Sequence, residues 1–238
     1  YVVQMDDYPS EDMKDYPADA EPKSKIMLLE DKDGDGFYET GTVFASGLKY
    51  ANGVMPWKGG VLVTSAPDIL FLKDSDGDGK KKKKKVMLTG FAVTNPQLRM
   101  GSLRYGLDNW IYGAYSRAGG GKWREEFRGK GSLLNFPENP QQDLPKIFPG
   151  TNFRFLPDEF KLEPSGGMSQ FGLSFDASWA QFTNWNNVHI RHVVINDNYL
   201  LNNPFLSLDN TMADISDHGN ASPVYEKKKN MLNLHESE

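Results

Sequence analysis

The chain of 238 residues contains no cysteine, which excludes disulfides, thiol catalysis, thiolate zinc sites and covalent c-type haem attachment within it. No stretch approaches the run of about 18 apolar residues that a membrane helix needs. Helical periodicity is almost absent as well, so a bundle of amphipathic helices is not expected. Hydrophobic residues nevertheless make up 38% of the chain and aromatic residues 12%, which is enough to build a globular core.

The charge balance indicates little affinity for nucleic acid. The formal net charge is -5 at pH 7, although residues 80–85 are all lysine. No aromatic residue is interleaved with this run, as it would be in a surface that stacks bases. We therefore expect the lysines to form a solvated arm of a hairpin, and we predict no nucleic-acid partner.

Short apolar runs bounded by Gly, Pro, Asn and Asp recur along the chain and predict an all-β fold. One unit of four predicted strands begins at residue 53 and reads GVMPW, VLVTSA, ILFLKD and VMLTGF. Two similar units begin at residues 102 and 171, and the runs YVVQM, KIMLLE and TVFASGL supply the last three strands of an earlier one. Units of four strands that recur in this way are typical of the blades of a β-propeller.

We therefore predict a partial β-propeller over residues 1–206, with about four blades and an insertion at residues 116–150. Residues 207–238 are polar and irregular and are predicted to form a connection or tail. Four blades alone would leave apolar faces and strand edges open. We expect the remaining blades to come from the same chain or from another one.

The stretch DKDGDGFYET, residues 31–40, has the composition of a calcium loop. Its ligand positions 1, 3, 5, 7 and 9 are filled by Asp31, Asp33, Asp35, the carbonyl of Phe37, and Glu39. Position 12, where an EF-hand has glutamate, is a threonine, and no helix is expected on either side. We predict a Ca²⁺ ion with a structural role in a hairpin loop. Turn formation by Asp and Gly without a metal is the alternative.

A second loop, DSDGDG at residues 74–79, repeats the first one 43 residues further along. Asp74, Asp76 and Asp78 fill positions 1, 3 and 5, but position 9 is Lys82. A positive charge where a ligand belongs predicts weaker Ca²⁺ binding than in the first loop. Both loops join the third strand of a unit to its fourth. The pocket of a propeller lies at the other end of the strands, where the second-to-third and unit-to-unit connections meet.

The predicted pocket side is built from residues 47–53, 64–68, 90–101, 116–150, 165–171 and 184–189. Asn95, Arg99 and Asn186 are the candidates for contact with a cofactor, and His189 is the candidate base. Each also has a purely structural interpretation. The arginine can form an ion pair, the asparagines can close turns, and the histidine can sit at a strand edge.

A family resemblance rests on EDKDGDGFYETGTVFASGLKYANGVMPWKGGVLVTSAPDILFLKDSDGDG, SLRYGLDNWIYGAYS and HVVINDNYLLNNPFL. From residue 2 to residue 225 the chain resembles the propeller domain of planctomycete-type membrane-bound dehydrogenases. Those proteins are exported, often carry a C-terminal cytochrome c domain, and are similar to the soluble quinoprotein glucose dehydrogenases. The resemblance implies a six-bladed, extracytoplasmic propeller, periplasmic or at the cell surface. It also implies that the propeller binds pyrroloquinoline quinone, oxidises a sugar or alcohol, and passes electrons to a haem domain outside this segment.

One position departs from that family. The glucose dehydrogenases have a histidine base before their G-x-L-x-x-G-x-D strand, and when that strand is matched to GSLRYGLD the position is Leu98. The neighbouring Arg99 can orient an anionic cofactor but accepts no proton at neutral pH, so His189 is the remaining candidate base. A non-catalytic propeller that binds glycans or protein partners is the alternative. A hydrolase with calcium on its axis would need more converging carboxylates than Asp68 and Asp176 provide.

Overall fold

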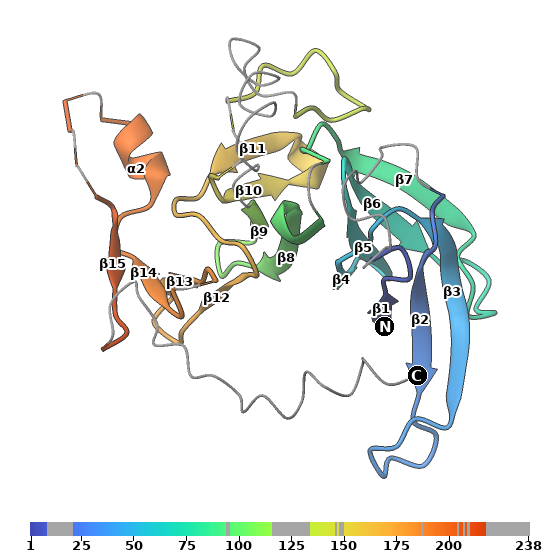
Figure 1. Cartoon of the computed structure of the whole chain (residues 1–238). Coiled ribbons are helices and arrows are strands. Elements are labelled where there is room, and N and C mark those ends of the chain that lie inside the picture. Colours follow the sequence, from blue (N-terminus) through green and yellow to red (C-terminus); the bar gives the residue numbers. More distant parts are fainter. Residues whose placement is uncertain are drawn as a thin grey trace, which may run out of the picture.

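The computed structural model describes residues 1–8, 21–93, 96–115, 134–145, 147, 150–186, 188–203, 205–206, 208 and 210–217. Within these residues the protein is all-β, as predicted, and its strands form four antiparallel sheets (Figure 1). No helix in this part of the chain is long and apolar enough to cross a membrane.

Each sheet is made of strands that are consecutive in the sequence. The first sheet contains β1 (Val2–Gln4), β2 (Ser24–Glu30) and β3 (Thr40–Leu48). The second contains β4 (Gly53–Trp57), β5 (Gly60–Ser65), β6 (Asp68–Lys73) and β7 (Lys83–Leu88). The third contains β8 (Met100–Tyr105), β9 (Ile111–Tyr115), β10 (Phe153–Leu156) and β11 (Lys161–Pro164). The fourth contains β12 (Leu173–Phe175), β13 (Gln181–Thr183), β14 (Arg191–Val193) and β15 (Met212–Asp214). The short helices are η1 (Pro96–Leu98), η2 (Pro157–Glu159) and α2 (Asp197–Leu201).

The second sheet is buried on both faces, which explains why β5 is apolar at successive positions. Successive side chains of a strand point to opposite faces of its sheet. Val61 and Val63 belong to the core shared with the first sheet, whereas Leu62 belongs to the core shared with the third sheet. All three side chains are fully buried. Burial of an aliphatic side chain of this size stabilises the fold by about 1.5–3 kcal/mol, so this run holds three sheets together.

Aromatic rings fill the core between the second and third sheets. The ring centroid of Phe153 lies 5.0 Å from that of Phe91, and Phe91 meets Tyr115 edge-on at 5.1 Å. Gly113 of β9 faces the Phe153 ring so closely that an added Cβ would lie 2.3 Å from its Cζ atom. Glycine is therefore required at residue 113 for this packing.

The sheets stand side by side in an arc, with β4, β8 and β12 nearest its middle and β7, β11 and β15 on the outside (Figure 1). The inner strands contact one another in order, β4 against β8 and β8 against β12. Asn52 Nδ2 donates a hydrogen bond of 2.9 Å to the carbonyl of Met100, which links the second sheet to the third. The backbone N–H of Leu173 donates to Ser102 Oγ at 3.3 Å, which links the third sheet to the fourth.

Two segments hold more structure than the sequence indicates. In the insertion, residues 116–133, 146, 148 and 149 lie outside the described part, but Asn135 pairs with Thr89 beside β7, and Phe136 is buried in the main core. In the stretch expected to be irregular after residue 206, β15 pairs with β14 and forms the fourth strand of its sheet. Residues 207, 209 and 218–238 of that stretch lie outside the description. The strand MAD is too short for a pattern of alternation to reveal it.

Candidate functional site

The first aspartate loop joins β2 to β3 and is shaped by its own carboxylates. Asp31 Oδ1 accepts a hydrogen bond from the backbone N–H of Gly34 at 2.7 Å, and its Oδ2 accepts one from Gly36 at 2.9 Å. Both glycines have positive φ values, +80° and +91°, which L side chains rarely adopt. The alternation of Asp and Gly therefore forms the turn by itself, before any metal is considered.

Four carboxylates of this loop converge. They belong to Asp31, Asp33, Asp35 and Glu39, and one oxygen from each lies within 4.8 Å of the others. Glu39 Oε2 accepts from the backbone N–H of Lys32 at 2.9 Å, which fixes this side chain against the loop. The N–H of Phe37 donates to Asp35 Oδ1 at 2.7 Å. These acidic side chains could hold a metal ion.

The second loop joins β6 to β7 and repeats the same turn. Asp74 accepts from the backbone N–H groups of Gly77 and Gly79, both at 2.8 Å. Carboxylate oxygens of Asp74, Asp76 and Asp78 again lie within 4.8 Å of one another. Lys82 makes the difference, because its Nζ lies 2.6 Å from Asp78 Oδ2 and 3.2 Å from Asp76 Oδ2. An ammonium group thus stands among carboxylates that would otherwise face a bound cation.

The hydrogen bonds of the second loop shift the pKa values of its charged groups. The hydrogen bond from Lys82 is the main cause that lowers the pKa of Asp78 below its usual range. The pKa of Asp74 is lowered chiefly by the backbone hydrogen bond from Gly77. In return, the bond to Asp78 raises the pKa of Lys82. At neutral pH the loop is therefore closed by internal ion pairs.

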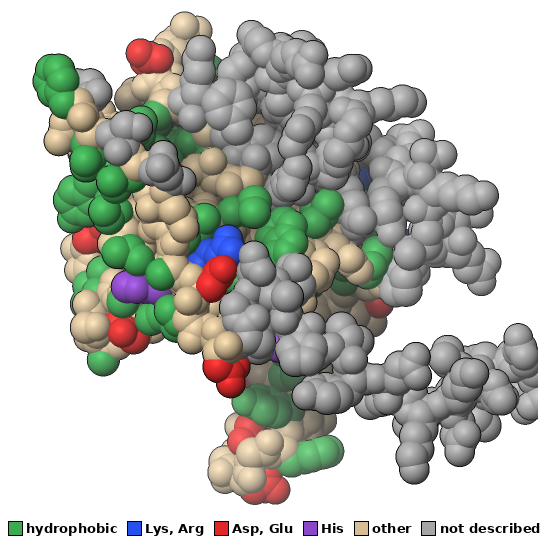
Figure 2. All heavy atoms as spheres, turned by 60° about the vertical axis from the view of Figure 1, so that its left-hand side comes forward, with side chains coloured by type: hydrophobic (Ala, Val, Ile, Leu, Met, Phe, Trp, Pro, Cys, Tyr) green, Lys and Arg blue, Asp and Glu red, His purple; other side chains and the backbone are tan. Residues whose placement is uncertain are grey.

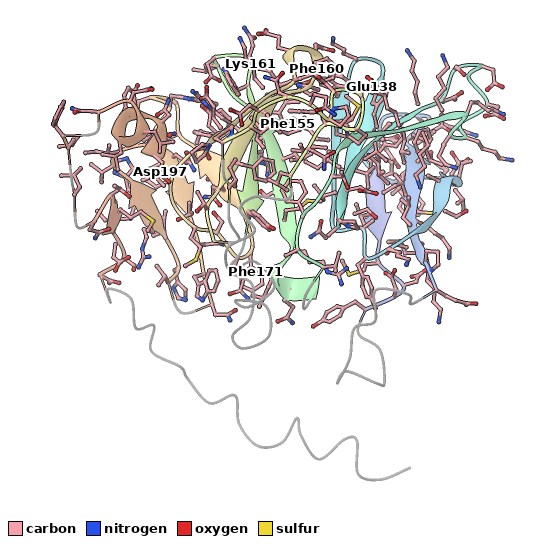
Figure 3. The ribbon with its side chains drawn as sticks, turned by 90° about the horizontal axis from the view of Figure 1, so that it is seen from above. Glu138, Phe155, Phe160, Lys161, Phe171 and Asp197 are labelled. Carbon is pink, nitrogen blue, oxygen red and sulfur yellow. The ribbon has the colours of Figure 1, made fainter. Side chains whose placement is uncertain are left out.

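The two ends of the strands carry different connections. Phe160 and Lys161, at the turn between β10 and β11, lie at one end of the third sheet, whereas Phe171, just before β12, lies at the other end (Figure 3). The aspartate loops connect the last two strands of their sheets, as the turn at Phe160 does. The segments that lead from one sheet to the next lie at the opposite end of the strands, where Phe171 lies.

A cleft of about 240 Å³ lies among these sheet-to-sheet segments. We call it the Arg99 cleft, and the polar side chains that line it are Tyr8, Asn52, Gln97, Arg99, Ser102 and Gln170. Arg99 is only 4% exposed, and its guanidinium lies 4.2 Å from the ring centroid of Tyr50. One of its N–H groups donates to the carbonyl of Val93 at 2.9 Å. Arg99 is the charged residue among those described that line the cleft.

Gln170 adds a polar group to the same cleft. The side chain is 7% exposed, and its Oε1 is buried without a hydrogen-bond partner among the described residues. A buried acceptor without a donor is rare in folded proteins and often marks a place where a ligand or water binds. The cleft therefore offers a cation and an amide from two different sheet-to-sheet segments.

Among the predicted cofactor and base residues that the structure describes, Arg99 is separate from Asn186 and His189. Arg99 lines the cleft, but Asn95 lies outside the described residues. Asn186 and His189 are exposed on the connection between β13 and β14 of the fourth sheet and do not line the Arg99 cleft. Leu98, at the position of the family's base, lies on η1.

Asp68 and Asp176 also have local roles. Asp68 accepts a hydrogen bond from the hydroxyl of Thr89, and Asp176 accepts from the backbone of Ser178 and Ala180 in the turn between β12 and β13. Neither aspartate lines the Arg99 cleft. They therefore form no carboxylate cluster there.

The repeated four-stranded unit could have indicated two cleft residues that were not predicted from single motifs. Asn52 directly precedes β4, Arg99 directly precedes β8, and Gln170 comes shortly before β12. All three stand at the entry to the first strand of a four-stranded sheet. Superposition of the repeats by their first strands would have pointed to Asn52 and Gln170 beside Arg99.

The family model described as "Domain of unknown function (DUF7133)" matches residues 1–238. The chain belongs to the DUF7133 family. No curated protein and no solved structure matches it. The DUF7133 match spans all four sheets, both aspartate loops and the Arg99 cleft, so the family covers the whole candidate site.

Proposed function

We propose that the four sheets are consecutive blades of a β-propeller that is six-bladed when complete, with its remaining blades from the same chain or another one. The arc of antiparallel sheets in Figure 1 and the contacts between successive inner strands support this arrangement. The residues at the entry to β4, β8 and β12 would then face the propeller axis. The Arg99 cleft would accordingly be an axial cleft.

The first aspartate loop is proposed to hold Ca²⁺ in a structural role. Calcium prefers six to eight oxygen ligands, and the converging carboxylates of Asp31, Asp33, Asp35 and Glu39, with the carbonyl of Phe37, would supply five ligand groups, which bidentate binding or water can complete. The loop connects two neighbouring strands at the end away from the Arg99 cleft. A metal there would stiffen the hairpin and would not meet a ligand in the cleft.

The Arg99 cleft is proposed to bind a small ligand that carries a carboxylate. The observation that carries this proposal is the buried guanidinium of Arg99 in the wall of the cleft. The unpartnered Oε1 of Gln170 is an acceptor and suits an N–H or O–H donor elsewhere on the same ligand. The family resemblance makes pyrroloquinoline quinone the first candidate, in an extracytoplasmic sugar or alcohol dehydrogenase that passes electrons to a haem domain outside this segment. Such a quinone, when bound, supplies the electron acceptor for the oxidation.

The described part of the cleft supplies no base for that oxidation. None of its lining residues is a histidine, aspartate or glutamate, and His189 lies elsewhere. For this reason we derive binding and orientation of the ligand from these residues, and no proton transfer. The same observation favours a second candidate, a calcium-stabilised propeller that binds glycans or protein partners without catalysis.

Calorimetric titration of the intact protein with pyrroloquinoline quinone tests the proposal. We expect binding that Arg99→Ala abolishes and that the matched change Arg104→Ala, at an exposed position of β8, leaves intact. An assay with an artificial electron acceptor over sugars and alcohols then separates the two candidates. Turnover that Arg99→Ala abolishes indicates the dehydrogenase, because the bound quinone would be its electron acceptor. Absence of both quinone binding and turnover contradicts the dehydrogenase and favours the binding propeller.

A further inference from the structure

A larger cleft lies between the third and fourth sheets, at the end of the strands away from the Arg99 cleft. Its volume is about 630 Å³, in the range of about 300–1,000 Å³ that is usual for small-molecule sites. The turn between β8 and β9, the turn between β12 and β13, and the segment that contains α2 form its walls. Figure 2 turns this side of the molecule forward and shows hydrophobic, basic, acidic and histidine side chains close together. We call this hollow the inter-sheet cleft.

One wall of the inter-sheet cleft is aromatic and rigid. Phe175 and Trp179 stack face to face, with ring centroids 3.9 Å apart and an angle of 3° between the planes, and Tyr112 meets both edge-on. Trp179 has a φ of +71°, which is unusual for a bulky side chain. Asp176 fixes this strained turn by accepting hydrogen bonds from the backbone on either side of Trp179. The indole is therefore set in place before any ligand arrives.

The polar part of the wall centres on Arg154, whose side chain is 14% exposed. Its guanidinium donates to Asp108 Oδ2 at 2.9 Å and to Glu163 Oε2 at 2.6 Å. The hydroxyl of Tyr112 donates to the same oxygen of Asp108 at 2.8 Å. Two carboxylates thus surround one guanidinium, and the group carries no excess positive charge. The acidic groups around Arg154 therefore do not favour an anion.

The opposite wall comes from α2 and offers an unused acceptor. Asn198 lines the cleft, and its Oδ1 is buried without a hydrogen-bond partner among the described residues. The next residue, Tyr199, also lines the cleft and is 68% exposed. The cleft therefore has an aromatic ring on each of two walls, together with carboxylate and amide groups.

We propose that the inter-sheet cleft binds a neutral saccharide, at a site separate from the Arg99 cleft. A sugar ring presents a face of C–H groups that packs on aromatic rings, and hydroxyl groups at its rim that both donate and accept hydrogen bonds. Trp179 and Tyr199 supply the aromatic surfaces, and Asn198 and Asp108 supply acceptors for the hydroxyls. The two carboxylates around Arg154 select neutral sugars over uronic acids, whose carboxylate would meet Asp108.

Calorimetry or ligand-observed NMR on the intact protein tests this site with maltotriose, cellotriose and xylotriose, and with trigalacturonate as the acidic counterpart. At least one neutral trisaccharide should bind and trigalacturonate should not. Tyr199→Ala and Asn198→Ala, both on α2 and not in the main core, should each weaken that binding by ~10-fold or more, as expected when a stacked ring or a hydrogen bond of about 1.4 kcal/mol is lost. Tyr38→Ala, at a tyrosine of similar exposure in the first aspartate loop, is the matched control and should have no effect.

Three results would overturn the proposal: no binding of the neutral sugars, binding that survives both variants on α2, or preference for trigalacturonate. Arg99→Ala keeps this test apart from the function proposed above. That variant should lose the carboxylate ligand and retain the saccharide. Loss of saccharide binding in Arg99→Ala would place the sugar in the Arg99 cleft and would refute a separate site.

Discussion

Replacement of Lys82 by glutamate should convert the second aspartate loop into a metal loop. In the native loop the Lys82 ammonium contacts the carboxylates of Asp76 and Asp78. Lys82→Glu removes this internal cation and puts a carboxylate at position 9, where the first loop has Glu39. The backbone turn should remain, because it depends on the hydrogen bonds that Asp74 accepts from the backbone.

The expected size of the effect follows from the charges of the two loops. The first loop gathers four carboxylates, whereas the second gathers three carboxylates and one ammonium group. The substitution therefore changes the local charge by two units and gives both loops the same set of acidic groups. Calcium loops span dissociation constants from about 10⁻⁹ to 10⁻³ M as ligand charge and rigidity vary, so a gain of ~100-fold in Ca²⁺ affinity is expected.

Calorimetric titration with CaCl₂ measures this change directly. The native protein should bind one Ca²⁺ tightly, and Lys82→Glu should add a second site of comparable affinity. Lys84→Glu makes the same charge change at an exposed position of β7 that forms no ion pair with the loop in the described structure, and should add none. A single site in Lys82→Glu, or an equal gain in Lys84→Glu, would refute the role assigned to the ammonium group.

Three further predictions follow from the same structure. Asp33→Ala should reduce total Ca²⁺ binding more than Asp76→Ala does in calorimetry, and equal losses would contradict the ranking of the loops. Asn152→Ala should lower the free energy of unfolding, measured with urea, by about 1–3 kcal/mol. Asn152 is fully buried, and removal of its side-chain oxygen leaves the N–H of Tyr115 without this acceptor. An unchanged urea midpoint would contradict this prediction. The carboxyl of Asp78 should titrate below its usual range in ¹³C NMR, since its ammonium partner lowers its pKa. A lowered pKa in the folded state stabilises the protein at pH values above the unfolded-state pKa of about 3.9, and this stabilisation is lost as the pH falls through the folded-state pKa. An Asp78 pKa at the ordinary value would contradict this contribution.

Much of the fold follows from local patterns in the sequence. The runs GVMPW, VLVTSA and ILFLKD correspond to β4, β5 and β6, because apolar and β-branched residues bounded by turn residues specify both the strand and its ends. The aspartate loops were predictable for the same reason. Asp31 and Asp74 bind backbone N–H groups no more than five residues away, so the sequence of the loop alone contains the information.

Features that depend on distant partners were not predictable in this way. β15 has only three residues and exists because β14 offers it an edge to pair with. Asn135 pairs with Thr89, which is far away in the sequence, so no local pattern predicts this contact. The Arg99 cleft likewise depends on which connections meet in space. Arg99 and Gln170 meet there, whereas His189 lies on a connection that runs elsewhere.

A crystal structure of the intact protein grown with Ca²⁺ and pyrroloquinoline quinone would show whether the Arg99 cleft holds the quinone. We expect quinone density in the Arg99 cleft, with a ligand carboxylate at the hydrogen-bond distance of about 2.7–2.9 Å from the Arg99 guanidinium. We also expect an ion among the carboxylates of the first aspartate loop, at the other end of the strands. Quinone bound away from Arg99, or a cleft that stays without ligand at saturating quinone, would refute the proposal that this cleft is the ligand site.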